Sequence, residues 1–325
     1  MVVVVSLNPS VDWQYDVPNF LHGGMNRVKL TRQDVAGKGI NVCVALKNLK
    51  LNPLYMGFNF IENGDLLIDK LSTAQIEHDL ITLPGAIRVN IKLYEKATKS
   101  MTELNQPGAS VSAQSVKKLS EKIKQNTWNV EHKTRNAEQN ILILTGSCPQ
   151  GVKDDFYSQV CQNWYGKVIL DTEGEALRKA VESSKPPYAI KPNLYELQNT
   201  FGVKSTELKE IALFCRDLIT RTNVQLVCVS LGVEGAVMVS PTFACYCPAF
   251  DVKTKGVHGA GDAMVAGLAY GLQLQKDISG KRLFSYMMSA ATATVSHEGT
   301  NMCTYKGFKE ILDTKPHLRF ENILD

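Results

Sequence analysis

Short apolar runs alternate along the chain with longer amphipathic segments. The short runs show no polar alternation, which is typical of strands buried on both faces of a parallel sheet. They lie at residues 2–7, 141–144, 168–170, 188–190 and 226–229. The amphipathic segments have helical spacing and lie at residues 40–49, 66–75, 113–124, 153–164, 175–183, 206–221, 263–274 and 280–296. The alternation predicts a doubly wound, mostly parallel, Rossmann-like α/β sheet, whose ligands bind beyond the carboxyl ends of the strands.

Two segments, at about 13–33 and 87–106, alternate apolar and polar residues and predict antiparallel strands. Neither has the mass for a core of its own. We therefore expect a small β-sheet lid on a single domain that spans residues 1–325. The free edges of lid strands could pair with a second copy of the chain, which predicts a homodimer. The polar segment 126–140 is predicted to be an exposed connection.

Composition narrows the class of protein. Of 325 residues, 44% are hydrophobic and 21% are charged, which is typical of a soluble globular protein. Lys and Arg number 36 against 32 for Asp and Glu, so the formal charge of +4 does not favour nucleic acid as a partner. No apolar run reaches the roughly 18 residues of a membrane span, and residues 1–6 lack the basic region of a signal peptide. The eight scattered cysteines suit reduced thiols, so we expect a cytoplasmic protein.

The sharpest motif is the run Gly259, Ala260, Gly261 and Asp262, which opens the amphipathic segment 263–274. Small residues at a helix start let backbone N–H groups approach an anion, and the helix dipole adds partial positive charge. Phosphate oxygens are the natural ligand of such a turn. A carboxylate there can accept a hydroxyl proton while the amides stabilise a transferring phosphoryl group. The alternative is that Asp262 only caps the helix.

A second glycine turn, with Gly37, Lys38, Gly39 and Asn41, also opens a helical segment. It is not a P-loop, because Lys38 is followed by Gly rather than Ser or Thr and the upstream Gly spacing is missing. The loop at residues 8–12, after the first strand, contains no Gly and so fails the dinucleotide fingerprint. The turn suits a hydroxylated or phosphorylated small ligand, and a solvated turn is the alternative.

Three charged residues near the predicted lid are candidates for holding such a ligand. Asp12 could hold two adjacent hydroxyl groups with its two oxygens, or it could only form an Asx turn. Arg27 and Arg88 lie in the two lid segments, where guanidinium groups could close on a phosphate. Taken singly, either arginine is more often a solvated strand residue.

Asn193 and Glu196 follow Lys191 at the start of another helix, and their spacing places them on one face. Their oxygens suit magnesium bound through water. The same spacing is also typical of a capping box. After the apolar run at 226–229, a nucleotide could lie against the backbone of a turn that contains Ser230, Gly232 and Gly235.

Together these motifs resemble the ribokinase-like (PfkB) family of carbohydrate kinases, and within it the branch of 1-phosphofructokinases and tagatose-6-phosphate kinases. The resemblance runs from about residue 2 to 300, with its markers in order and at family spacing. The markers are Leu7-Asn8-Pro9 with Asp12, Gly24 with Asn26-Arg27, Gly37-Lys38-Gly39-Ile40-Asn41, Arg88 with Asn90, Thr102-Glu103, Gly146-Ser147, Lys191-Pro192-Asn193 with Glu196, Ser230-Leu231-Gly232 and Gly259-Ala260-Gly261-Asp262.

The resemblance implies an ATP-dependent kinase that converts fructose 1-phosphate to fructose 1,6-bisphosphate. It implies that Asp262 is the catalytic base and that the amides from Gly259, Ala260 and Gly261 onward form the anion hole. The sugar would be bound by Asp12, Gly37, Lys38 and Asn41, and its phosphate by Arg27 and Arg88. ATP would lie along Lys191, Ser230, Gly232, Gly235 and Gly261, and Mg²⁺ would be positioned by Asn193 and Glu196.

Two alternatives remain within this resemblance: a tagatose-6-phosphate kinase, and a non-catalytic regulator that binds sugar phosphates on the same fold. The chain also departs from the branch pattern. Ala36, Ile87 and His258 stand where the branch usually has Gly, Thr and Val. Because these positions border the implied sugar and phosphoryl sites, they bear on which sugar is bound rather than on whether the chain catalyses.

Overall fold

The computed structural model describes residues 1–133, 139–254, 256, 258–275, 278–297, 301–314 and 321–324. Within them, the main element is a ten-stranded sheet. Its strands, in spatial order, are β14 (Glu321–Asn322), β13 (Ala244–Cys247), β12 (Ala236–Val239), β11 (Leu226–Ser230), β10 (Ala189–Ile190), β9 (Lys167–Asp171), β8 (Ile141–Thr145), β1 (Val2–Ser6), β4 (Pro53–Glu62) and β5 (Glu77–Ala86). Neighbours from β11 to β5 pair in parallel, and those from β11 to β14 pair antiparallel. The predicted doubly wound, mostly parallel sheet is confirmed.

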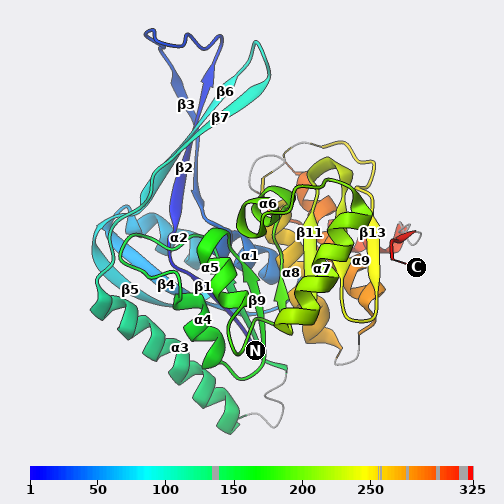
Figure 1. Cartoon of the computed structure of the whole chain (residues 1–325). Coiled ribbons are helices and arrows are strands. Elements are labelled where there is room, and N and C mark those ends of the chain that lie inside the picture. Colours follow the sequence, from blue (N-terminus) through cyan, green and yellow to red (C-terminus); the bar gives the residue numbers. More distant parts are fainter. Residues whose placement is uncertain are drawn as a thin grey trace.

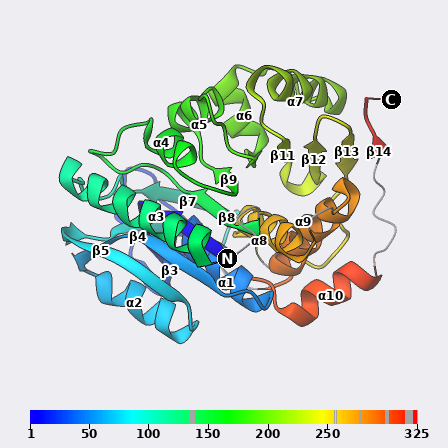
Figure 2. The same cartoon turned by 90° about the horizontal axis from the view of Figure 1, so that it is seen from below.

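Helices cover both faces of this sheet (Figures 1 and 2). One face carries α4 (Phe156–Gln162), α5 (Gly174–Val181), α6 (Leu194–Phe201) and α7 (Leu208–Thr222), with α3 (Ala113–Lys133) beside α4. The other carries α1 (Lys38–Asn48), α2 (Gly64–Thr73), α8 (Ala260–Leu274), α9 (Gly280–Val295) and α10 (Tyr305–Thr314). Each predicted amphipathic segment coincides with one of these helices. In the described part of the chain, no helix has the length and apolar character needed to cross a membrane.

The predicted lid is a separate four-stranded sheet that projects from the main body (Figure 1). Its strands, in spatial order, are β3 (Lys29–Ala36), β2 (Ser10–Val17), β6 (Arg88–Glu95) and β7 (Ser100–Asn105). The outer pairs are antiparallel, and β2 and β6 run parallel. Strand β1 belongs to the main sheet and β2 to the lid sheet, and only a short loop separates them. The chain therefore passes from the main sheet into the lid directly after β1.

The structure differs from two sequence-based expectations. Strands β4 and β5 extend the main sheet but were not predicted, because β4 is a long mixed run and β5 is an edge strand with Pro84 near its end. The segment 126–140 is not simply a connection, because α3 continues to Lys133 and residues 134–138 lie outside the described part.

Candidate active site

A cavity of about 990 Å³ is bounded by the lid strands and by the carboxyl ends of the parallel strands. This is the edge of the sheet at which ligands of doubly wound folds bind. Most of the residues singled out in the sequence line it. They are Gly37, Lys38, Asn41, Arg88, Lys191, Asn193, Glu196, Ser230, Gly232, Gly235, Gly259, Ala260, Gly261 and Asp262.

The glycine turn before α8 has the features expected of a helix start that binds an anion. Gly259 is the N-cap residue, and its φ of +79° lies in the left-handed region that favours glycine. The N–H groups of the first turn that follows have no acceptor within the helix. A side chain at Gly261 would come within 3.2 Å of the Lys191 ammonium, so the turn lies against a positive charge. Because Gly259 occupies the cap position, Asp262 is not the helix cap.

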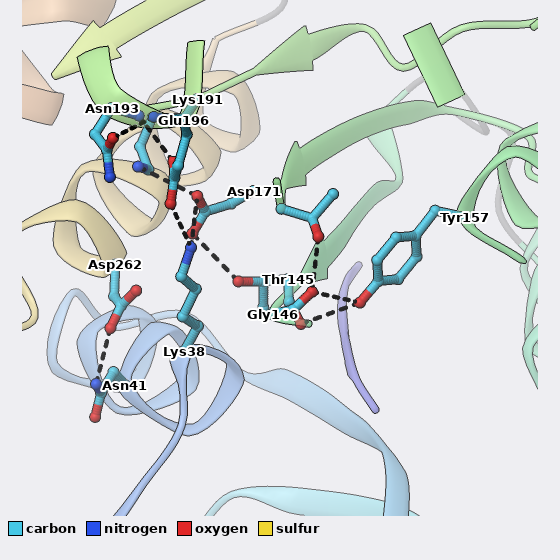
Figure 3. Close-up of polar contacts among 11 residues, drawn as sticks. Lys38, Asn41, Thr145, Gly146, Tyr157, Asp171, Lys191, Asn193, Glu196 and Asp262 are labelled. Carbon is cyan, nitrogen blue, oxygen red and sulfur yellow. Dashed lines mark hydrogen bonds and ion pairs between the residues drawn. The ribbon is translucent and has the colours of Figure 1, made fainter. Parts of the chain in front are cut away.

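Asp262 lies in the first turn of α8, and only 8% of it is exposed. The Asn41 side chain on α1 donates a hydrogen bond of 2.8 Å to Oδ2 of Asp262 (Figure 3). Burial and the nearby Asp171 carboxylate raise the pKa of Asp262 to about 6, although Lys38, Asn41 and Lys191 oppose the shift. A carboxylate with this pKa is mostly ionised at neutral pH and still binds a proton readily, as a general base requires.

Two lysines converge on Asp171, which ends β9 and is buried (Figure 3). The Nζ atoms of Lys38 and Lys191 lie 3.4 Å and 3.2 Å from its Oδ1. Burial alone would raise the pKa of Asp171, but the two ammonium groups outweigh it and hold that pKa below its usual range. Burial would likewise lower the pKa of Lys38, and the surrounding carboxylates instead raise it. The cavity floor therefore holds two charged ammonium groups beside the α8 turn.

Asp171 is not among the site residues predicted from the sequence, and Lys38 was predicted to bind the sugar. In the structure, the Lys38 ammonium faces Asp171 and also lies 3.4 Å from Oε1 of Glu196. A signal for Asp171 was present, because a carboxylate that follows the apolar run 168–170 ends a strand at the predicted ligand edge.

Asn193 and Glu196 form a capping box at the start of α6. The Glu196 N–H donates to Asn193 Oδ1 at 2.7 Å, and the Asn193 N–H donates to Glu196 Oε2 at 2.8 Å. The capping-box role that the spacing of this pair also indicated is therefore present. It occupies one carboxylate oxygen of Glu196 and leaves Oε1, which faces Lys38, on the cavity side.

The lid contributes Arg88 to the cavity wall. Its Nη1 donates to the Gln106 carbonyl at 3.1 Å, while its buried Nε has no hydrogen-bond partner among the residues that the structure describes. Asp12, on lid strand β2, is buried and is not part of the cavity lining, and its Oδ2 lies 2.7 Å from the ammonium of Lys92. Lys92, which the sequence analysis missed, is also buried and lines the cavity.

Arg27 is not brought to the cavity. It is exposed in the connection between β2 and β3, which forms the end of the lid farthest from the main sheet (Figure 1). The strands of the lid extend well beyond the cavity, so a residue at this end is carried away from the remaining candidates. The sequence spacing alone could not show this, because it does not report the direction in which a hairpin projects.

The turn after β11 forms another part of the cavity. Ser230 ends β11. Gly232 begins a short 3₁₀ turn and Gly235 follows it, with φ values of +64° and +110°. A Cβ at Gly235 would lie 2.1 Å from the Cys247 carbonyl oxygen, so only glycine fits there. Ser230, Gly232 and Gly235 all line the cavity at this end.

The family assignment follows from comparison with known proteins. Residues 1–306 match the family described as pfkB family carbohydrate kinase. The chain belongs to this family. It is therefore a carbohydrate kinase, an enzyme of a family that uses ATP as phosphoryl donor.

Individual relatives carry two related names. The chain is 28% identical over 317 residues to a 1-phosphofructokinase of Borreliella burgdorferi, covering 96% of both chains. It is 31% identical over 283 residues to a 1-phosphofructokinase of Rhodobacter capsulatus, covering 86% of this chain and 85% of the relative. It is 27% identical over 314 residues to a tagatose-6-phosphate kinase of Staphylococcus epidermidis, covering 93% and 96%.

The fold is shared with solved structures. Phosphofructokinase-2 from Escherichia coli, crystallised with substrates and products, superposes with a TM-score of 0.84 at 23% identity, covering 97% of this chain and 99% of that one. The ribokinase-like arrangement of a main sheet with a smaller lid sheet is thus confirmed.

Proposed function

We propose that this kinase transfers the γ-phosphoryl group of ATP to fructose 1-phosphate and so forms fructose 1,6-bisphosphate. The observation that carries the proposal is the position of Asp262. This buried carboxylate and its amide turn share one cavity with the lid arginine Arg88 and with the glycine turn at Gly232 and Gly235. Such a cavity suits a phosphorylated sugar and a nucleotide at the same time, and the 1-phosphofructokinase relatives support the choice of sugar.

Asp262 would act as the general base. It accepts the proton of the acceptor hydroxyl while the hydroxyl oxygen forms a bond to the γ-phosphorus. The bond between that phosphorus and the bridging oxygen breaks, and ADP leaves with the electron pair. The N–H groups of the α8 turn and the ammonium groups of Lys38 and Lys191 lie around this point and would stabilise the negative charge of the transferring group.

The residues present fit a magnesium ion bound largely through water. Within the described ranges, no group of three His, Cys, Asp or Glu side chains could hold a metal by itself. Glu196 Oε1 and the Asn193 side chain line the cavity at the start of α6. Together with phosphate oxygens and water they would provide the oxygen ligands that Mg²⁺ prefers, and the bound ion would neutralise charge on the nucleotide phosphates.

At the sugar end, Arg88 is the residue best placed to bind the phosphate that the substrate already carries. Its buried Nε has no partner within the described residues, and a buried donor without a partner is costly unless a ligand satisfies it. Gly37 and Asn41 line the same cavity, and Asp12 lies on lid strand β2 with its charge balanced by Lys92. We propose that these residues bind the sugar, with no direct role for Arg27 from the same chain.

We also propose that two copies pair through their lids. Strands β3 and β7 are the edges of the lid sheet. Large apolar side chains are exposed on the lid and its connections, namely Phe20, Leu21, Met25, Val28, Leu30, Met101 and Leu104. Free strand edges beside exposed apolar side chains are typical of an interface. Sedimentation should show a dimer that a Met25→Asp and Leu104→Asp double variant converts to monomer, and a wild-type monomer would refute the pairing.

A coupled assay of ADP release across a panel of sugar phosphates tests the function. We expect fructose 1-phosphate to give the highest kcat/KM. A tenfold preference for tagatose 6-phosphate, about 1.4 kcal/mol in transition-state binding, would favour the tagatose-6-phosphate kinase alternative. Asp262→Asn should still bind both substrates and lose on the order of 100-fold or more in turnover. A wild type that binds sugar phosphates without releasing ADP would instead be a regulator.

A further inference from the structure

One contact between a histidine and a carboxylate joins the lid to the main domain. His258 Nδ1 lies 4.0 Å from Oε1 of Glu103, and both side chains line the cavity. Glu103 is on β7 of the lid, whereas His258 immediately precedes the Gly259 turn of α8. Among the ion pairs of the described residues, no other links the lid sheet to the rest of the molecule. This contact therefore lies between the lid and the turn that carries Asp262.

Strand register explains why Glu103 faces His258. Lys92 on β6 lies directly opposite Glu103 on β7, so their side chains emerge on one face of the lid. The Lys92 ammonium is already neutralised by Asp12 at 2.7 Å, and both of these side chains are about 10% exposed. Glu103 is 39% exposed and, within the described residues, forms no ion pair besides the one with His258. Its carboxylate is thus available to a partner from the main domain.

The charge of His258 depends on what surrounds it. Burial lowers the pKa of its ring, and the nearby cations Lys92 and Arg32 lower it further. Glu103 and Asp12 oppose that shift without reversing it. The ring is therefore neutral at pH 7 in the ligand-free protein, and its separation from Glu103 exceeds hydrogen-bond distance. A phosphorylated sugar brings additional negative charge into the same cavity, which favours the protonated ring.

We propose that His258 and Glu103 form a substrate-dependent latch, in which binding of a phosphorylated sugar protonates His258 and the imidazolium ion pairs with Glu103. The proton comes from solvent. The pair draws β7 towards the turn before α8, so His258 is a positioning residue that favours phosphorylated over unphosphorylated sugars. This inference rests on the proposed function for its ligand, but not for the interaction between the two side chains.

The first test uses the free protein and needs no substrate. The His258 ring is titrated by NMR in the wild type and in Glu103→Gln, with His258→Gln used to assign its resonance. Loss of the carboxylate should lower the ring pKa further, and an unchanged pKa would overturn the pairing. Addition of fructose 1-phosphate should raise the ring pKa in the wild type, whereas unphosphorylated fructose should leave it in place. A rise with both sugars, or with neither, would overturn the latch.

The second test separates positioning from chemistry. His258→Gln and Glu103→Gln should each raise KM for the sugar phosphate, by about tenfold if one charge-assisted contact is lost, with kcat and the KM for ATP nearly unchanged. The double variant should be no worse than either single variant, because both remove the same pair. His78→Gln is the matched control, because His78 is an exposed histidine on β5 outside the cavity lining, and it should leave KM unchanged.

Additive losses in the double variant would overturn the latch. A wild type inactive on all sugar phosphates would refute the proposed function and the dependence of the latch on substrate. The titration of the free protein would still show whether His258 and Glu103 interact.

Discussion

Asn41→Ala should move the acid limb of the rate profile to higher pH. In the structure, Asn41 donates a hydrogen bond of 2.8 Å to Oδ2 of Asp262. This hydrogen bond lowers the Asp262 pKa and so limits the rise that burial causes. If Asp262 is the base, it must be ionised to act. The wild-type kcat should therefore rise with pH through a midpoint near 6, the pKa to which burial and Asp171 raise this carboxyl group.

The size of the shift follows from the strength of that bond. A hydrogen bond to a charged acceptor contributes about 1.5 to 3 kcal/mol, and one pKa unit corresponds to about 1.36 kcal/mol. Loss of the bond should thus raise the Asp262 pKa by roughly one to two units, to between roughly 7 and 8. At pH 7 the ionised fraction would fall from roughly nine-tenths to between about one half and one tenth. At pH 9 the two enzymes should differ much less.

The measurement is kcat at saturating substrates between pH 5 and pH 9. Because we also propose that Asn41 contacts the sugar, KM can change as well, and the position of the limb is the diagnostic quantity. Asn48→Ala is the matched control, since Asn48 lies on the same helix and donates one hydrogen bond, of 2.9 Å, to the Cys303 carbonyl outside the cavity lining. A wild type with no limb near pH 6, or a variant whose loss is equal at every pH, would refute the reasoning.

Three further outcomes are expected. Glu196→Gln should raise the magnesium concentration needed for half-maximal rate, because the site loses charge but not the base; an unchanged dependence would leave Glu196 with its capping role alone. Arg88→Ala should weaken sugar-phosphate binding by about 1.5 to 3 kcal/mol and leave ATP affinity nearly unchanged in calorimetry, whereas equal losses would mean that Arg88 only supports the lid. Gly267→Ala should lower the free energy of unfolding, measured in urea, by about 1 to 3 kcal/mol, because the added Cβ on α8 would lie 2.6 Å from the Tyr286 carbonyl oxygen on α9. A variant as stable as the wild type would show that α8 and α9 can move apart without cost.

The order of the main elements could be predicted from the chain alone. A buried parallel strand contacts apolar neighbours on both faces, so β1 has every residue buried and reads as an uninterrupted apolar run. The glycine turns were also predictable, because a left-handed residue such as Gly259 at a helix start leaves a local signature. Edge strand β5 was missed, since only two of its side chains, Ile81 and Leu83, are buried and the periodic signal is correspondingly weak. The end of α3 was missed because its sequence is polar.

The charge states and partners of the site residues were decided by tertiary structure. The sequence placed Asp262 on a helix start, but its raised pKa depends on burial and on Asp171, which is remote in the chain. The positions of Lys38 beside Asp171 and of Arg27 at the far end of the lid likewise depend on how α1, β9 and the lid pack and project. The physical reason is that periodicity records local backbone geometry and one-sided burial, whereas electrostatic interactions depend on distances between atoms that only the folded chain brings together.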